Sequence, residues 1–286
     1  MMTKCFFNHS KVWSLLAAST IVASCAFAQD TSDFASKRLL DIASREEQIY
    51  KKIADDPEFY SAEDLDRRIN ELITSYRTYL TDNTEDVSAF VLYGKLLRRV
   101  DQHEQAFTAF LKADEIDPNI AVVKQQIGTY LAETGKGKAA LTFYLRAADL
   151  EPEVALYHFS IGQLLFQFRA EFIEDNIFTV DAIDREISKA FRTAAALEPD
   201  NFNFQMRLGE AYYDLQSPDW KSALLHWDKL RKTSDETLQR EIIDLHKARV
   251  LGKLGRSTEA RVLAATIVRP SLQQSKQQVL DEMSVY

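Results

Sequence analysis

The feature that most constrains this chain is the recurrence of small and helix-ending residues at a fixed interval. Gly94, Gly128 and Gly162 stand 34 residues apart. An interval of this length in a helix-forming sequence is typical of a repeat built from two antiparallel helices. The same interval separates two further pairs, Ala106 with Ala140 and Pro118 with Pro152.

Each residue type in the repeat has a physical role. A glycine on the first helix lets the second helix approach closely, and the small alanine on the second helix meets it. The aromatic residue four positions after the alanine lies on the same helical face, and we expect it to fill the space between repeats. Proline ends the repeat because it cannot continue a helix. A third copy ends at Pro199, and a fourth has Gly209 and Ala223.

This pattern resembles the tetratricopeptide repeat (TPR), most specifically over residues 87–199 and more weakly to about residue 270. The resemblance implies an all-α fold, a right-handed α-solenoid of antiparallel helix pairs with capping helices at both ends. It also implies a non-enzymatic protein-protein interaction scaffold. In the first copy of the repeat, the residues that match the family pattern are Tyr93-Gly94, Ala106, Phe110 and Pro118.

The sequence predicts four segments. Residues 1–28 resemble an export signal, 29–86 form a helical cap or degenerate repeat, and 87–270 contain the repeats. Residues 271–286 form a polar tail or capping helix, because solenoids need atypical terminal units to cover the ends of the stack.

The amino-terminal segment predicts export. Residues 1–28 contain Lys4 and Lys11 and no acidic residue, and the apolar run 12–22 is followed by a small-residue end, Ala26-Phe27-Ala28. Cleavage after Ala28 removes these two positive charges, so the formal net charge of −8 becomes −10. The expected product is a periplasmic or secreted protein. Its acidity argues against nucleic acid as a partner.

Cys25 leaves an alternative open. Val22-Ala23-Ser24-Cys25 resembles the lipobox of bacterial lipoproteins, whose cysteine is acylated. On that alternative the protein is a lipid-anchored assembly factor for outer-membrane, pilus or secretion machinery, and the anchor is its only membrane contact. Since Cys5 and Cys25 are the only cysteines, the rest of the chain has no disulfide and no thiolate metal site.

The third copy contains an insertion. Pro152 and Pro199 are 47 residues apart, 13 more than the period, and the extra residues lie at about 169–181. We expect both helices of this hairpin to be lengthened, with Asp175-Asn176 near the tip. The insertion either carries binding contacts or packs on its neighbours.

The sequence predicts no catalytic residues, no cofactor and no metal site. His158 and His226 occupy helix positions where a packed or hydrogen-bonded ring is expected, and no histidine has metal-ligand spacing. Residues 135–138, Gly-Lys-Gly-Lys, lack the spacing of a phosphate loop.

The resemblance also implies a ligand groove lined by the first helix of each repeat. The charge along it would run from basic, through apolar and aromatic, to acidic, which suits an extended or helical peptide. The alternative is that its aromatic residues bury adjacent repeats. The expected groove residues are Lys95, Arg98, Arg99, Gln125, Phe159, Gln163, Phe166, Met206, Glu210 and Tyr213.

Overall fold

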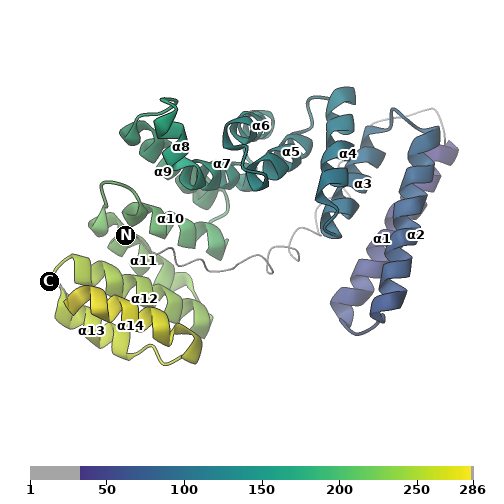
Figure 1. The fold of residues 1–286 in the computed structure, drawn as a ribbon. Helices are drawn as coiled ribbons and strands as arrows, with labels where there is room; N and C mark the ends of the chain where they lie inside the picture. The colour runs from purple at the N-terminus through teal and green to yellow at the C-terminus, as the bar shows by residue number, and fades with distance from the viewer. Residues whose placement is uncertain (1–32, 285–286) are drawn as a thin grey trace. The chain divides into compact units, whose positions relative to one another are not determined.

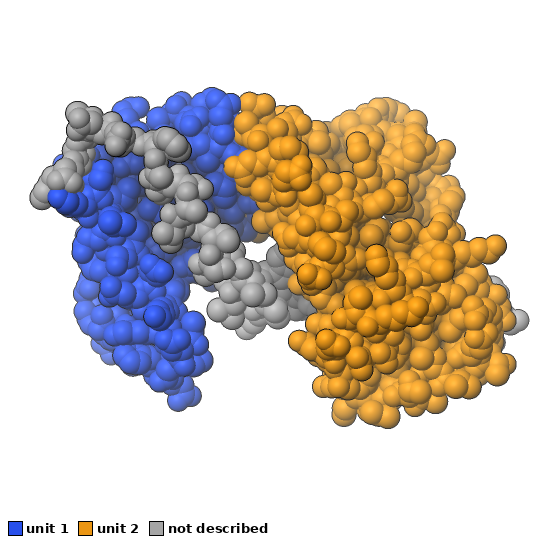
Figure 2. Space-filling view, turned by 180° about the vertical axis from the view of Figure 1, so that it is seen from behind, with its two compact units in different colours: residues 1–130 blue, residues 131–286 orange. Residues whose placement is uncertain are grey.

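A computed structural model describes residues 33–284, and over these residues the chain forms fourteen α-helices, one 3-10 helix and no strand (Figure 1). The expected signal segment 1–28, with Cys25, lies outside the described residues. The chain divides into two compact units, residues 1–130 and 131–286 (Figure 2). The boundary falls within α5 (Ala121–Glu133), and each unit is described here by itself.

Unit 1 holds the predicted cap and the first repeat. Side-chain caps fix where its helices begin: Ser61 Oγ accepts a hydrogen bond from the Asp64 amide at 3.1 Å, and Asp86 Oδ1 accepts one from the Ala89 amide at 3.0 Å. Tyr76 is fully buried in the cap. The cap hairpin is α1 (Asp33–Asp55) and α2 (Ala62–Asp82), and the repeat is α3 (Val87–Arg99) and α4 (His103–Ile116).

Unit 2 continues with helical hairpins and ends in a cap. Its helices are α6 (Gly137–Leu150), α7 (Ala155–Gln167), α8 (Arg169–Glu174), α9 (Val180–Leu197), α10 (Phe202–Asp214), α11 (Trp220–Thr233), α12 (Thr237–Lys253) and α13 (Ser257–Ala265). The 3-10 helix η1 (Pro270–Leu272) and α14 (Gln273–Ser284) follow.

The repeat glycines contact the aromatic residue of the same hairpin. A Cβ atom added at Gly94 would lie 2.8 Å from the Phe110 ring, and one added at Gly162 would lie 2.7 Å from the Phe191 ring. Gly209 meets the Trp227 ring in the same way. Phe191 and Trp227 also contact the following hairpin, through Arg207 and His246 respectively, so these two rings lie between repeats as well as against the first helix of their own hairpin.

The small residues of the second helices are enclosed as predicted. Ala106 is 2% exposed, and Ala140 and Ala223 are 0% exposed. A larger side chain at these positions would force the two helices of a hairpin apart.

The insertion of the third repeat differs from its prediction. The first helix, α7, is not lengthened, because it has the same 13 residues as α3 and α10. The inserted residues instead form the short helix α8 and a turn in which Asn176 has a φ of 58°. Only the second helix, α9, is longer, with 18 residues against 14 in α4.

The insertion packs on its own unit. Phe172 is 1% exposed, Arg169 donates two hydrogen bonds to Asp184, and Lys138 Nζ lies 2.8 Å from Asp175 Oδ2. This is the packing alternative that the sequence left open.

The carboxyl-terminal residues form a helix, α14, that packs on the last hairpin. In α14, Val279 is 0% exposed and Met283 is 8% exposed, and both belong to a core shared with α12 and α13. Gly252 of α12 lies directly under Met283. Figure 1 shows α14 running alongside these two helices.

Candidate functional site

In unit 1, part of the predicted basic surface is used internally. Arg99 Nη1 donates to Glu46 Oε1 at 3.2 Å, and its guanidinium lies 4.0 Å from the centre of the Tyr50 ring. Tyr76 donates its hydroxyl proton to the other oxygen of Glu46 at 2.9 Å. Arg99 therefore joins the first repeat to α1, whereas the sequence predicted it as a ligand contact.

Burial of Glu46 has an electrostatic consequence. Loss of water raises the pKa of its carboxyl group, and the Tyr76 hydrogen bond and the charges of Arg99 and Lys95 act in the opposite direction. Lys95 and Arg98 are half-buried on α3. Gln125 is 8% exposed and donates to Thr129 Oγ1 at 3.1 Å, so it is not an open contact point.

In unit 2, Phe159 is part of the interior. It is 5% exposed, and its ring centre lies 4.7 Å from that of Phe204 and 5.7 Å from that of Phe191. Phe159 thus joins two successive hairpins, which is the packing alternative and not the role of a ligand anchor.

Phe166 is placed differently. It lies one helical turn from the buried Gly162 on the same helix, yet 37% of it is exposed. The guanidinium carbon of Arg207 lies 4.2 Å from the centre of its ring and 4.7 Å from that of Phe191. A cation over an aromatic face stabilises both groups, so the ring is held in place although it faces solvent.

Arg207 also organises the polar residues around this ring. Its Nε donates to Gln163 Oε1 at 2.9 Å, and its Nη1 donates to Asp214 Oδ2 at 2.8 Å and Glu210 Oε2 at 3.3 Å. We call Gln163, Phe166, Arg207, Glu210 and Asp214 the Arg207 cluster. It brings together three of the predicted groove residues, which are Gln163, Phe166 and Glu210.

The other two predicted contacts of α10 lie deeper. Met206 and Tyr213 are partly buried and pack against the core cluster that contains Trp227. The Tyr213 hydroxyl is hydrogen-bonded to His246 Nδ1, and its ring stacks on Trp220 with centres 5.5 Å apart.

The groups behind the cluster have shifted pKa values. The His246 ring stacks on Trp227 at 4.7 Å and its side chain is 14% exposed, so burial lowers its pKa to about 3. Burial raises the pKa of Glu210, opposed by the charge of Arg207. Burial also raises the pKa of Tyr213.

The sequence interpretation missed Arg207, Asp214 and His246 as site residues. A signal for the first two was present, because residues three and seven positions after Arg207 lie on its helical face and are both acidic. No comparable signal identifies His246, whose partners are 33 and 19 residues away on other helices. The two histidines expected to be hydrogen-bonded are so: the ring Nε2 atoms of His158 and His226 lie 2.7 Å from backbone oxygens.

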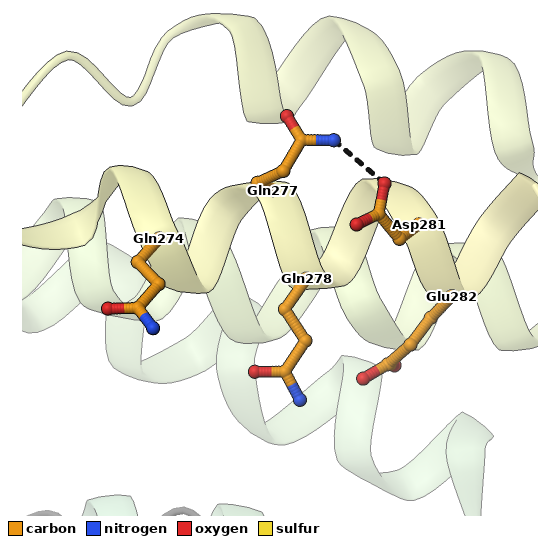
Figure 3. A pocket seen from close by; sticks show the side chains of 5 residues that line it. All are labelled: Gln274, Gln277, Gln278, Asp281 and Glu282. Atoms are coloured by element: carbon orange, nitrogen blue, oxygen red, sulfur yellow. Dashed lines mark hydrogen bonds between the residues drawn. The ribbon is translucent and has the colours of Figure 1, made fainter.

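A second surface feature is a hollow of about 530 Å³ on α14. Figure 3 shows that the side chains lining it all come from this one helix, with Gln277 donating to Asp281 at 2.7 Å. A single helix encloses no ligand, so the hollow is a polar stripe on the cap. Its lining residues are Gln274, Gln277, Gln278, Asp281 and Glu282.

Within residues 33–284, no group of three or more His, Cys, Asp or Glu side chains is arranged to hold a metal ion. No helix in this part of the chain is long and apolar enough to cross a membrane.

Repeated antiparallel hairpins with enclosed glycines define the class of helical repeat proteins. The family model of the tetratricopeptide repeat matches residues 87–120. Residues 87–120 are therefore a tetratricopeptide repeat, and the described helices around them form an all-α repeat fold of helical hairpins. No curated protein sequence matches the chain.

Solved structures agree with this fold. The structure of PilF from Pseudomonas aeruginosa has a TM-score of 0.59 at 12% identity, covering 87% of this chain and 99% of PilF. YrrB has a TM-score of 0.55 at 12% identity, covering 73% of this chain and 95% of YrrB. MamA has a TM-score of 0.51 at 15% identity, covering 70% of this chain and 98% of MamA. Identities this low show a shared fold alone.

Proposed function

We propose that this chain is a non-enzymatic scaffold of the bacterial cell envelope that binds a segment of another protein across the first helices of its repeats. The observation that carries the proposal is the Arg207 cluster, in which an aromatic ring is held at the surface by a buried cation. Exposed aromatic side chains on a rigid frame are the usual anchors of protein-protein contacts.

The fold supports this kind of binding. Stacked helical hairpins present extended surfaces to which a peptide or helix can bind. YrrB, which shares the fold, is described as a TPR protein with an unusual peptide-binding site. In this chain Phe166 is the anchor, and Gln163 and Glu210 supply polar contacts beside it.

The test is site-specific photo-cross-linking. A photoreactive phenylalanine analogue replaces Phe166 in one variant and Lys189 in a control variant, whose side chain is 77% exposed on α9. We expect a discrete cross-linked protein from position 166 that position 189 does not give. Purified, that protein should bind the Phe166→Ala variant about tenfold more weakly than wild type. The same products from both positions would contradict the proposal.

Export is part of the proposal and rests on residues 1–28, which lie outside the described residues. The second candidate is a lipid-anchored assembly factor, favoured by the lipobox-like sequence ending at Cys25. The intact mass of the mature protein from its host distinguishes the two. A chain beginning at Gln29 supports a periplasmic or secreted scaffold, and an acylated chain beginning at Cys25 supports the anchored form. A chain that retains Met1 would contradict export by either route.

A further inference from the structure

The Arg207 cluster has an unequal distribution of charge between its interior and its surface. Arg207 provides one positive charge, whereas Glu210 and Asp214 provide two negative charges. The Arg207 side chain is only 10% exposed, but those of Glu210 and Asp214 are 34% and 32% exposed. The cation therefore lies underneath, and an approaching partner meets the carboxylates.

A further cation that acts on Glu210 does not cancel this surplus of negative charge. Arg249 of α12 attracts Glu210 electrostatically, but its Nε lies 3.4 Å from Glu282 Oε2 on α14. Because Arg249 has a carboxylate partner of its own, these two residues balance one another. With both carboxylates ionised, the Arg207 cluster keeps a net charge of −1 beside the exposed ring of Phe166.

The cluster also contains an unpaired hydrogen-bond donor. Nη2 of Arg207 is enclosed and has no hydrogen-bond partner. A buried donor left unpaired is unfavourable, because it has lost its hydrogen bond to water without gaining another. An incoming carbonyl oxygen, which a peptide backbone provides at every residue, is the kind of acceptor that this N–H lacks.

We infer that the segment bound at the Arg207 cluster is basic, and that a lysine or arginine side chain of the partner lies with its aliphatic stem on Phe166 and its charged head against Glu210 and Asp214. Long cationic side chains pack in this way, because the methylene groups cover apolar surface while the head stays hydrated or paired. This inference rests on the proposed function and names the class of partner for the same surface.

The test uses two fluorescein-labelled peptides and the whole chain. One is an amphipathic peptide of leucine, lysine and arginine, and its twin has glutamate in place of every lysine and arginine. Binding is followed by fluorescence anisotropy at low and at physiological salt. The site variants are Glu210→Gln with Asp214→Asn, Asp214→Asn alone, and Phe166→Ala. The control, Asp181→Asn with Glu186→Gln, removes two exposed carboxylates from α9 of the same unit.

We expect the basic peptide to bind and the acidic twin to bind at least about tenfold more weakly. Each site variant should weaken the basic peptide, with the double variant losing about tenfold, and higher salt should lower its affinity. The control should bind like wild type. Circular dichroism melts establish that each variant is folded, and Asp214→Asn provides a milder change if the double variant is not.

Three outcomes would overturn the inference. Equal losses in the site and control double variants would show attraction to the net acidic protein as a whole. Binding of the acidic twin, weakened by Phe166→Ala, would retain the docking surface of the proposed function but reject a basic partner. Failure of both peptides to bind would also reject a basic partner, while the cross-linking experiment at Phe166 would still decide whether the surface binds protein.

Discussion

At the scale of single residues, Arg207 has the most consequential environment in unit 2. Its guanidinium contacts two aromatic rings, one amide oxygen and two carboxylates, from three helices. Removing one partner of a buried ion pair leaves the other charges uncompensated, which usually costs more than the pair contributes.

We therefore predict that Arg207→Met destabilises unit 2 by about 3–5 kcal/mol, because Glu210 and Asp214 would then repel each other without a cation between them. Urea unfolding followed by circular dichroism measures the change. Arg256→Met, which removes an exposed partner of Glu259, is the matched control and should leave the midpoint nearly unchanged. Equal effects of the two substitutions would show that Arg207 has no special structural role.

The pKa of His246 gives a prediction about pH. Its pKa is lowered from 6.5 to about 3, so between these values the unfolded chain binds a proton that the folded chain does not. The stability from the neutral ring is complete above pH 6.5 and is lost progressively as the pH falls towards 3. His226, whose pKa is also lowered by burial, acts in the same direction.

Glu210 acts in the opposite direction. Its raised pKa favours the protonated folded form, so its contribution is complete below pH 4.5 and is lost as the pH rises through the folded value. We predict that the urea midpoint of wild type falls from pH 7 to pH 4.5, and that His246→Phe shows a shallower fall over the same range. Parallel pH profiles for the two proteins would exclude His246 as the cause.

At the scale of the helical hairpin, the close contact between a glycine on the first helix and an aromatic ring on the second fixes how the two helices pack. Gly162 and Phe191 give the clearest case, because Phe191 is 0% exposed and cannot move aside into solvent. Alanine is the better helix former by about 1 kcal/mol, but the added methyl group would overlap the ring.

We predict that Gly162→Ala destabilises the protein by about 1–3 kcal/mol. Phe191→Leu creates space at the same place, so the double variant should be more stable than the sum of the two single changes implies. Thermal or urea unfolding of wild type, the two single variants and the double variant gives the double-mutant cycle that measures this coupling. Simple additivity would contradict a direct contact between residues 162 and 191.

Among the hairpins, the sequence predicted the positions of the repeats but not the fold of the insertion in the third repeat. The 34-residue interval located the hairpins because glycine, alanine and proline are needed at fixed positions. The fold of the insertion was not predictable from its apolar spacing, which continues from Leu165 through Phe168 to Phe172. The helix α7 instead ends at Gln167, and the ring of the next residue, Phe168, packs on Gly137, which lies 31 positions earlier.

At the scale of the whole molecule, the all-α repeat fold was predicted from the sequence, but the division at residues 130 and 131 was not. It falls inside α5, where the repeat pattern continues unchanged. The candidate site was predicted in part. Gln163, Phe166 and Glu210 lie together, whereas Phe159 is interior, because periodicity assigns a residue to a helical face without showing how much of that face a neighbouring hairpin covers.

The central claim is that a protein partner binds over Phe166, and hydroxyl-radical footprinting with the cross-linked partner tests it most directly. Phe166 is 37% exposed in the free chain, and Leu225 of α11 is 71% exposed and serves as the internal reference. We predict that saturating partner reduces oxidation of Phe166 several-fold while oxidation of Leu225 stays the same. Unchanged oxidation of Phe166 in the complex would contradict the account.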